Sequence, residues 1–237
     1  VSPGFIDSHT HAVRGIYDVP TAESSLLQGI TTLTEGNDGT SPFPIADHYL
    51  KIKNTKISPN WAVFVGQGTI RKNVMGLDNR DPTSEELNSM KLMVAEAMKD
   101  GALGISTGLF YVPGSFSTTN EVIELSKEAS KYGGIYISHM REEAGDILKS
   151  INETIDKLLN SNCSIVRFGD GEFNLSLGNY KYLDRFFGSI QKLHSRDTDL
   201  GGLKVGGRLD LFPLGFFSKG NDLLTADLAR EQTPKIL

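Results

Sequence analysis

The stretch Phe5-Ile6-Asp7-Ser8-His9-Thr10-His11 joins a short apolar run to a polar end that carries two histidines. Further apolar runs follow, most of them trailed by turn residues and a segment with helical spacing; they begin near Ile30, Trp61, Ala102, Ile135 and Ser164. Strands that alternate with helices are typical of βα units in a parallel sheet. The sequence therefore predicts an α/β fold with parallel strands over its first two thirds.

Two predicted helices begin with a capping box, in which a Thr hydroxyl and a Glu side chain three residues later cap each other's backbone N–H groups. Thr83 and Glu86 form the first box, and Gly101 is expected to end that helix. Thr118 and Glu121 form the second, and its helix is expected to stop at residues 133–134.

Composition narrows the class of partner. The 237 residues hold 24 Lys and Arg against 29 Asp and Glu, a net charge of −5, which argues against nucleic acid or an anionic membrane as partner. A single cysteine, Cys163, cannot form an internal disulfide, and no apolar run has the ~20 residues of a membrane-spanning helix. We expect a small-molecule or protein partner and a cytoplasmic protein; the periplasm stays open because the N-terminus reads like the interior of a domain.

Polar side chains gather at the predicted strand ends. His9 and His11 are two residues apart on one strand and so share a face, although such a pair alone is equally typical of a polar surface. The ends of the next strands carry Glu35, Asp38, Gln67, Thr107 and His139. If the strands curl into a barrel, these groups meet at its carboxyl-terminal rim. Imidazoles with carboxylates suit zinc or a similar divalent metal, which activates water for amide hydrolysis.

Two other histidines are predicted to lie on the surface. His48 falls within a predicted helix, and His194 falls in the irregular C-terminal third. Neither is expected to ligate a metal.

The strand-end motifs resemble the D-aminoacylase branch of the amidohydrolase superfamily over residues 1–155. The residues that carry this resemblance lie in the segments 3–11, 28–39, 64–71, 104–114 and 137–141. The resemblance implies a hydrolase that uses zinc or another divalent metal to remove the acyl group from N-acyl-D-amino acids. It also implies an incomplete (β/α)8 TIM-barrel-like metal-dependent hydrolase fold, here with an atypical C-terminal segment.

The resemblance assigns roles to particular residues. His9, His11 and His139 are implied metal ligands, while Tyr111 and Arg141 are implied to face the substrate. Asp38 stands where many relatives place a metal-binding Cys, and a carboxylate can also ligate zinc. Gln67 stands where relatives commonly have His, and its amide can hydrogen-bond a substrate.

Two catalytic features of the relatives are missing from residues 156–237, namely a His on the sixth strand and an Asp on the eighth. The catalytic residue is therefore unknown. We expect a truncated chain that retains metal but turns over weakly or not at all, since removing a general base typically costs ~10²–10⁴-fold in rate.

The C-terminal third lacks the alternation of apolar runs and helical patterns, and more than one interpretation of it stays open. Residues 154–194 resemble the start of a GT-D-type glycosyltransferase, in which Asp170 and Glu172 would hold a metal and a nucleotide sugar; a Gly-rich turn with two solvated acids is the other interpretation. Residues 174–196 are predicted to be helical, and residues 201–237 faintly resemble a phosphate-selective porin. The predicted divisions are 1–155, 156–196 and 197–237, and a composite chain without catalysis is the alternative.

Overall fold

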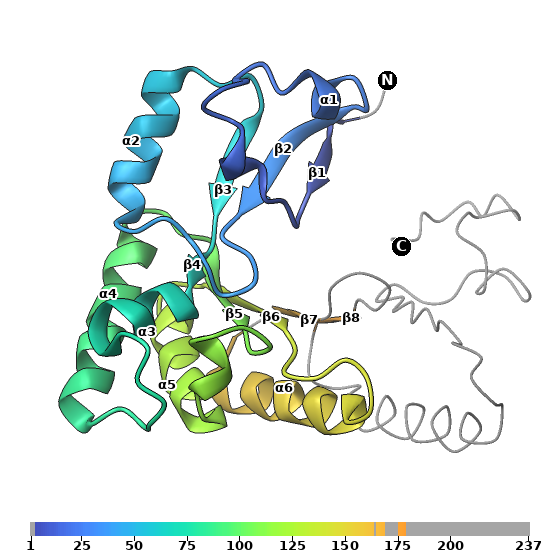
Figure 1. Ribbon diagram of the computed structural model, residues 1–237. Helices are drawn as coiled ribbons and strands as arrows, with labels where there is room; N and C mark the ends of the chain where they lie inside the picture. Colours follow the sequence, from blue (N-terminus) through green and yellow to red (C-terminus); the bar gives the residue numbers. More distant parts are fainter. Residues whose placement is uncertain (1–2, 164, 169–174, 179–237) are drawn as a thin grey trace, which may run out of the picture. The chain divides into compact units, whose positions relative to one another are not determined.

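The computed structural model describes residues 3–163, 165–168 and 175–178 (Figure 1). Every described residue belongs to one compact unit, which spans residues 1–188. The predicted site at Asp170 and Glu172, His194 and the porin-like segment lie outside the described residues.

The described strands form two sheets. The first is parallel and has the order β1-β2-β3, with bounds Phe5–Asp7, Ile30–Glu35 and Asn60–Val63. The second has the order β4-β5-β6-β7-β8, with bounds Val65–Gly66, Gly104–Gly108, Ile135–His139, Ile165–Phe168 and Leu175–Gly178. Only the β7–β8 pair is antiparallel among these described strands. The predicted α/β fold with parallel strands is confirmed.

Backbone hydrogen bonds link the two sheets where β3 passes into β4. Phe64, between the two strands, donates its N–H to the Glu35 carbonyl at 2.8 Å. Leu103, just before β5, donates to the Val63 carbonyl at 2.8 Å. Within each sheet the parallel strands follow one another in chain order, β1 to β3 and β4 to β7, which brings their carboxyl ends to one edge of that sheet.

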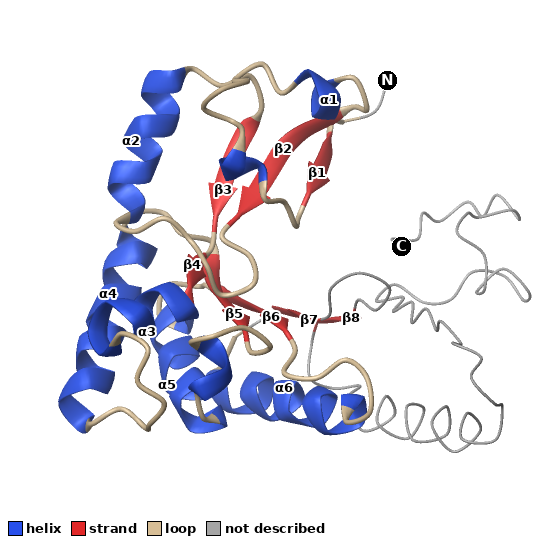
Figure 2. Cartoon of the chain, in the orientation of Figure 1, coloured by secondary structure: helices blue, strands red, loops and turns tan. Residues whose placement is uncertain are grey.

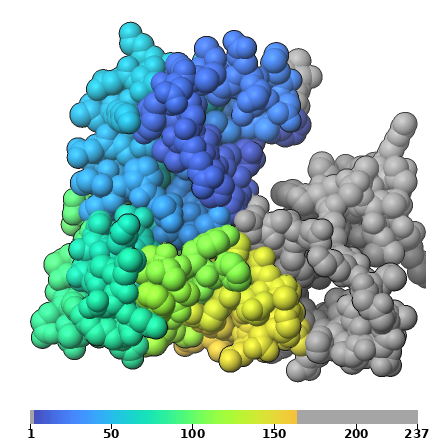
Figure 3. Space-filling view, viewed as in Figure 1, coloured from blue at the N-terminus to red at the C-terminus, as the bar shows by residue number. Residues whose placement is uncertain are grey.

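Helices connect the strands and cover the second sheet on one side (Figure 2). The α-helices α1 to α6 span Glu23–Leu26, Ile45–Thr55, Gln67–Met75, Ser84–Lys99, Thr119–Ser130 and Ile147–Ser161, and the short 3-10 helices η1 and η2 span Ala12–Arg14 and Gly114–Phe116. Figure 3 shows the consecutive segments from α3 to α6 side by side, coloured from green to yellow. Buried residues such as Val94, Ile105 and Leu125 fill the space between these helices and the strands.

The two predicted capping boxes have different outcomes. Thr83 and Glu86 cap each other in full at the start of α4, as predicted. At α5, Thr118 accepts from the Glu121 N–H, but the Glu121 carboxylate accepts from Gln67 and Arg71 instead of returning to Thr118. The Arg71 guanidinium is buried and has no water to solvate its charge. The Glu121 carboxylate therefore pairs with Arg71 and does not complete the capping box.

The prediction that His48 lies on the surface is wrong. Its side chain on α2 is buried, with Nδ1 2.9 Å from the Tyr17 hydroxyl. Its Nε2 accepts from the Trp61 indole N–H at 2.9 Å. Contacts with residues distant in sequence, rather than the pattern within the helix, decide the burial of this histidine.

Two smaller expectations also need correction. Gln67 does not end a strand, because Gly66 does so and Gln67 begins α3. Residues 175–178, expected to be helical, form β8 instead, and their alternation of Leu and Ser has the period of a strand.

No helix in the described ranges is long and apolar enough to span a membrane.

Candidate metal centre

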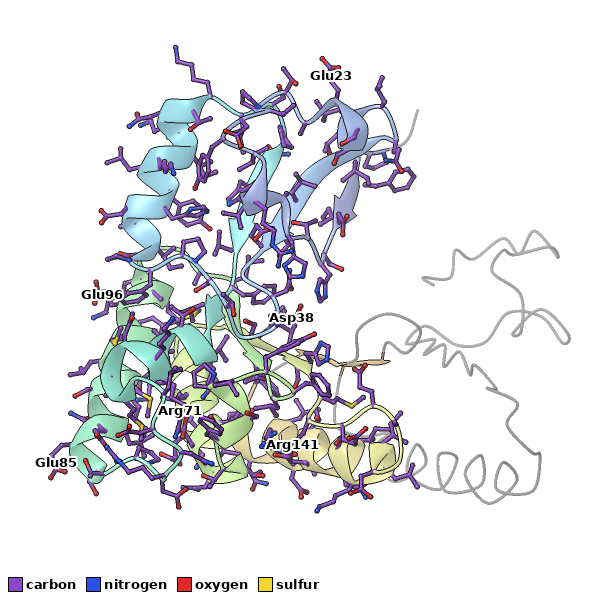
Figure 4. The ribbon with its side chains drawn as sticks, viewed as in Figure 1. Glu23, Asp38, Arg71, Glu85, Glu96 and Arg141 are labelled. Atoms are coloured by element: carbon purple, nitrogen blue, oxygen red, sulfur yellow. The ribbon has the colours of Figure 1, made fainter. Side chains whose placement is uncertain are left out.

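Three predicted ligands meet at the strand ends of the described unit. His9 and His11 follow β1, and Asp38 lies in the loop after β2, where Figure 4 labels it. The ligand atoms of these residues all lie within 4.8 Å of one another. Asp38 Oδ2 is 3.3 Å from His9 Nε2 and 3.2 Å from His11 Nε2.

The fourth predicted ligand, His139, approaches the other oxygen of the same carboxylate. It is the last residue of β6, and its Nδ1 lies 3.7 Å from Asp38 Oδ1. His9 and His11 therefore contact one carboxylate oxygen and His139 contacts the other. His139 lies outside the cluster of His9, His11 and Asp38 whose ligand atoms are all within 4.8 Å of one another.

This donor set suits a divalent metal such as zinc. Zinc takes nitrogen and oxygen ligands at about 2.0–2.1 Å in a tetrahedron, which separates neighbouring ligand atoms by roughly 3.3 Å. The contacts of Asp38 with His9 and His11, at 3.3 and 3.2 Å, have this spacing. The residues present thus fit the metal that the motifs imply.

The protonation state of Asp38 also suits ligation. Burial alone would raise its pKa, but hydrogen bonds and charge from His139 and His9 hold the pKa of the carboxyl well below its usual range. The carboxylate is ionised at neutral pH, as a metal ligand must be.

The backbone that presents Asp38 is closely packed. Asp38 has φ 56° and Gly39 has φ 72°, so the turn uses left-handed conformations that aspartate tolerates and glycine adopts without strain. A Cβ on Gly39 would lie 2.5 Å from the Gly108 N atom. Ser106, fully buried on β5, donates to the Gly36 carbonyl and accepts from the Gly39 N–H at 3.2 Å. One hydroxyl therefore pins both ends of the turn.

Glu35 holds the turn that carries His9 and His11. Its Oε1 accepts from the Thr10 hydroxyl at 3.1 Å and from the Val13 N–H at 3.2 Å. Burial raises the pKa of Glu35, and these hydrogen bonds oppose that rise. Glu35 thus supports the histidine pair, although its own carboxylate is not within the His9, His11 and Asp38 cluster.

Aromatic side chains border His139. The Tyr111 ring centroid is 4.8 Å from that of His139, and the Phe110 centroid is 6.0 Å away. Both aromatic side chains are exposed, so this border faces solvent. Tyr111 is therefore placed where a molecule bound beside His139 would meet it.

Gln67 and Thr107 lie deeper than their predicted position at a rim implies. Gln67 is fully buried, and its amide donates to Ser117 Oγ at 2.6 Å and to Glu121 Oε1 at 2.7 Å. Thr107 is fully buried as well, and its hydroxyl pairs with Tyr136 and Ser138. These polar groups serve contacts within the protein.

Arg141 is also engaged within the protein. It forms an ion pair with Glu153 of α6 and donates to the carbonyls of Ser115 and Ser117. The predicted contact of Arg141 with substrate stays a prediction.

Sequence reasoning missed the residues that support the ligands, above all Ser106 and the role of Glu35. Ser106 reaches Gly36 and Gly39 across a separation of about 70 residues, so no local pattern marks it. Glu35 did carry a signal as a carboxylate at the end of an apolar strand.

Curated relatives match this chain over about two thirds of its length. A D-aminoacylase from Alcaligenes xylosoxydans xylosoxydans is 37% identical over 177 residues, which is 65% of this chain and 37% of that protein. An N-acyl-D-aspartate deacylase from the same organism is 32% identical over 179 residues, covering 65% and 36%. The chain thus spans little more than a third of the length of these relatives.

Solved structures agree with the sequence matches. The crystal structure of a D-aminoacylase, described as defining a novel subset of amidohydrolases, has a TM-score of 0.66 at 27% identity and covers 82% of this chain and 45% of that one. An N-acyl-D-glutamate deacylase from Bordetella bronchiseptica, solved with zinc and a phosphonate inhibitor, has the same TM-score at 24% identity and shares the fold. No protein-family model matches the chain. The chain is homologous to D-aminoacylases, which confirms the resemblance that its strand-end motifs indicated.

Proposed function

We propose that this chain carries the metal centre of an amidohydrolase that acts on N-acyl-D-amino acids. The observation that carries the proposal is the convergence of His9, His11 and His139 on the ionised carboxylate of Asp38. These four residues come from three different strand ends, where barrel enzymes hold their chemistry.

An incomplete (β/α)8 barrel is the architecture we propose for the described unit. Parallel neighbours in chain order within each sheet, β1 to β3 and β4 to β7, support it, as do the helices on one side of the second sheet (Figure 2). The homologous D-aminoacylases support the substrate class, although the chain spans only 37% of the first of them.

Each residue of the centre has a defined task in this proposal. His9, His11, Asp38 and His139 would hold the metal, which when bound polarises a carbonyl oxygen and lowers the pKa of a coordinated water to about 7. Glu35 and Ser106 keep the ligands in place. Tyr111 provides an exposed aromatic wall beside His139 that can orient an acyl amino acid.

No residue of the proposed centre is assigned to proton transfer. The resemblance implies a His and an Asp from later strands, and we identify neither in residues 156–237. We therefore propose weak turnover or none, with metal binding retained; a composite chain without catalysis is the alternative that an activity assay separates.

Zinc titration of the chelator-treated full chain tests the metal centre. We expect about one equivalent of tightly bound zinc, with His9, His11 and Asp38 as its clustered ligands and His139 as the proposed fourth. His9→Ala and His139→Ala should lose this binding, while His194→Ala, the matched control, should retain it. Undiminished zinc binding in both site variants would contradict the proposed ligands.

Release of free amino acid from N-acetyl-D-amino acids tests the chemistry. We expect zinc-dependent release about 10²–10⁴-fold slower than a complete site would give, and selective for the D form. Release that is independent of zinc, or unchanged in His139→Ala, would exclude the proposed reaction.

A further inference from the structure

Arg141 is held within the protein by almost all of its hydrogen-bond donors. Its Nε donates to Glu153 Oε2 at 3.1 Å, and its Nη2 donates to Glu153 Oε1 at 3.0 Å. Nη2 also donates to the Ser117 carbonyl and Nη1 to the Ser115 carbonyl, both at 2.8 Å. These four bonds use four of the five N–H groups of a guanidinium.

This arrangement bears on substrate recognition. An arginine that recognises a carboxylate presents two parallel N–H groups to it. Arg141 has one N–H left, on Nη1, and its fork already faces Glu153. Arg141 therefore has no pair of parallel N–H groups available for a substrate carboxylate.

The two carbonyls that Arg141 binds belong to the loop that carries Tyr111, residues 110–117 between β5 and α5, here named the Tyr111 loop. Ser115 donates its N–H back to the Tyr111 carbonyl at 2.8 Å. Arg141 itself follows His139 by two residues. It thus ties the strand end that bears His139 to the loop whose tyrosine ring lies 4.8 Å from the His139 ring.

Helix α6 holds Arg141 in this orientation. Glu153 Oε1 also accepts from Thr119 at 3.0 Å and from Lys157 Nζ at 2.8 Å, and Lys157 is fully buried (Figure 4 shows Arg141 beside α6). Burial alone would raise the pKa of Glu153, but Arg141 and Lys157 hold it at about 2, so the carboxylate stays ionised. A buried lysine without this partner would be strongly unfavourable.

We propose that Arg141 is a positioning residue that, with Glu153 and Lys157, fixes the Tyr111 loop beside His139 and does not bind substrate. The inference rests on the proposed function, since the loop position affects catalysis only if His139 belongs to a hydrolytic centre.

Hydrogen exchange of the full chain tests the positioning without any need for activity. Arg141→Lys keeps the charge but loses the fork, and Glu153→Gln removes the carboxylate charge. In both variants the amides of Ser115, Phe116 and Ser117 should exchange roughly tenfold faster than in the wild type. Arg80→Lys is the matched control, because Arg80 forms a similar two-bond pair with Glu86 on the exposed surface, and it should leave the loop unchanged.

Kinetics and zinc content separate this inference from the proposed function. Positioning predicts that Arg141→Lys and Glu153→Gln lower kcat by similar factors, that the double variant is no worse than either, and that bound zinc is unchanged. A rise in KM for Arg141→Lys alone, with loop exchange unchanged, would overturn the proposal. If the wild type shows no turnover, kcat cannot be compared between the variants, and the exchange comparison alone decides the role of Arg141. If Glu153→Gln does not fold, Arg141→Lys against its control decides it.

Discussion

At the scale of single residues, Asp38 determines what the candidate centre can bind. Its backbone lies in the left-handed region at φ 56°, and its two carboxylate oxygens face imidazoles from different strands. The homologous family places a metal-binding Cys here in many members, as the resemblance implies. A carboxylate keeps the negative charge but replaces a soft sulfur ligand with a hard oxygen.

Substitution of Asp38 should separate charge from ligand type. We expect Asp38→Asn to weaken zinc binding by at least about 10–100-fold, because even supporting residues of metal sites have effects of that size. Asp38→Cys should retain zinc, since a thiolate also ligates it. Competition titration with a zinc-binding dye measures both, and equal affinity of Asp38→Asn and the wild type would exclude ligation by Asp38.

His48 should make the stability of the fold depend on pH. Its Nε2 accepts from Trp61, and burial first, then the charge of Lys51, lowers its pKa below the usual 6.5. The unfolded chain therefore binds a proton at this site before the folded chain does, so stability falls as pH falls below about 6.5.

The measurement is the free energy of unfolding by urea between about pH 7.5 and about pH 5.5. We expect His48→Gln to reduce the slope against pH, by at most about 1.4 kcal/mol per pH unit. The same slope in both proteins would show that His48 is not the titrating group.

At the scale of elements, side chains on one strand or helix bind loops and helices that are distant in the sequence. Ser106 on β5 pins the Asp38 turn after β2, and Glu121 on α5 pairs with Arg71 on α3. The strands from β1 to β7 were predictable from apolar runs and turn residues, whereas β8 was expected to be helical. These links were not, because they join residues 50 to 70 positions apart and depend on which strands become neighbours.

Ser106→Ala should weaken both the fold and the metal centre. The change leaves the Gly39 N–H and the Gly36 carbonyl without their buried partner, which costs about 1–3 kcal/mol. Ser89→Ala on the exposed face of α4 is the control and should change stability little. Urea unfolding with and without zinc measures both effects, and identical results for the two variants would contradict the role of Ser106.

Glu121→Gln should destabilise the fold strongly. Both Arg71 and Glu121 are buried, so the variant leaves a buried guanidinium without its carboxylate, at a cost of about 3–5 kcal/mol. Glu86→Gln breaks an exposed pair with Arg80 and serves as the control, for which we expect little change. Thermal unfolding compares them; equal losses would mean that burial of the pair does not matter.

At the scale of the whole molecule, the sequence and the structure agree where local patterns determine the outcome. The order of parallel strands, the α4 capping box and the strand-end positions of His9, Asp38 and His139 were all predicted. The burial of His48 and the hydrogen bond from Gln67 to Glu121 were not predicted, because tertiary contacts override the local pattern. The chain is homologous to proteins more than twice the length of the segment it matches, so the matched segment corresponds to only part of these relatives.

The most direct test of the central claim, that three histidines and Asp38 form one metal centre, is zinc K-edge X-ray absorption on the zinc-loaded full chain. We predict a single shell of nitrogen and oxygen at about 2.0–2.1 Å with imidazole scattering, and loss of part of that scattering in His9→Ala and in His139→Ala. A sulfur shell at about 2.3 Å, or a zinc spectrum that neither substitution changes, would contradict the account.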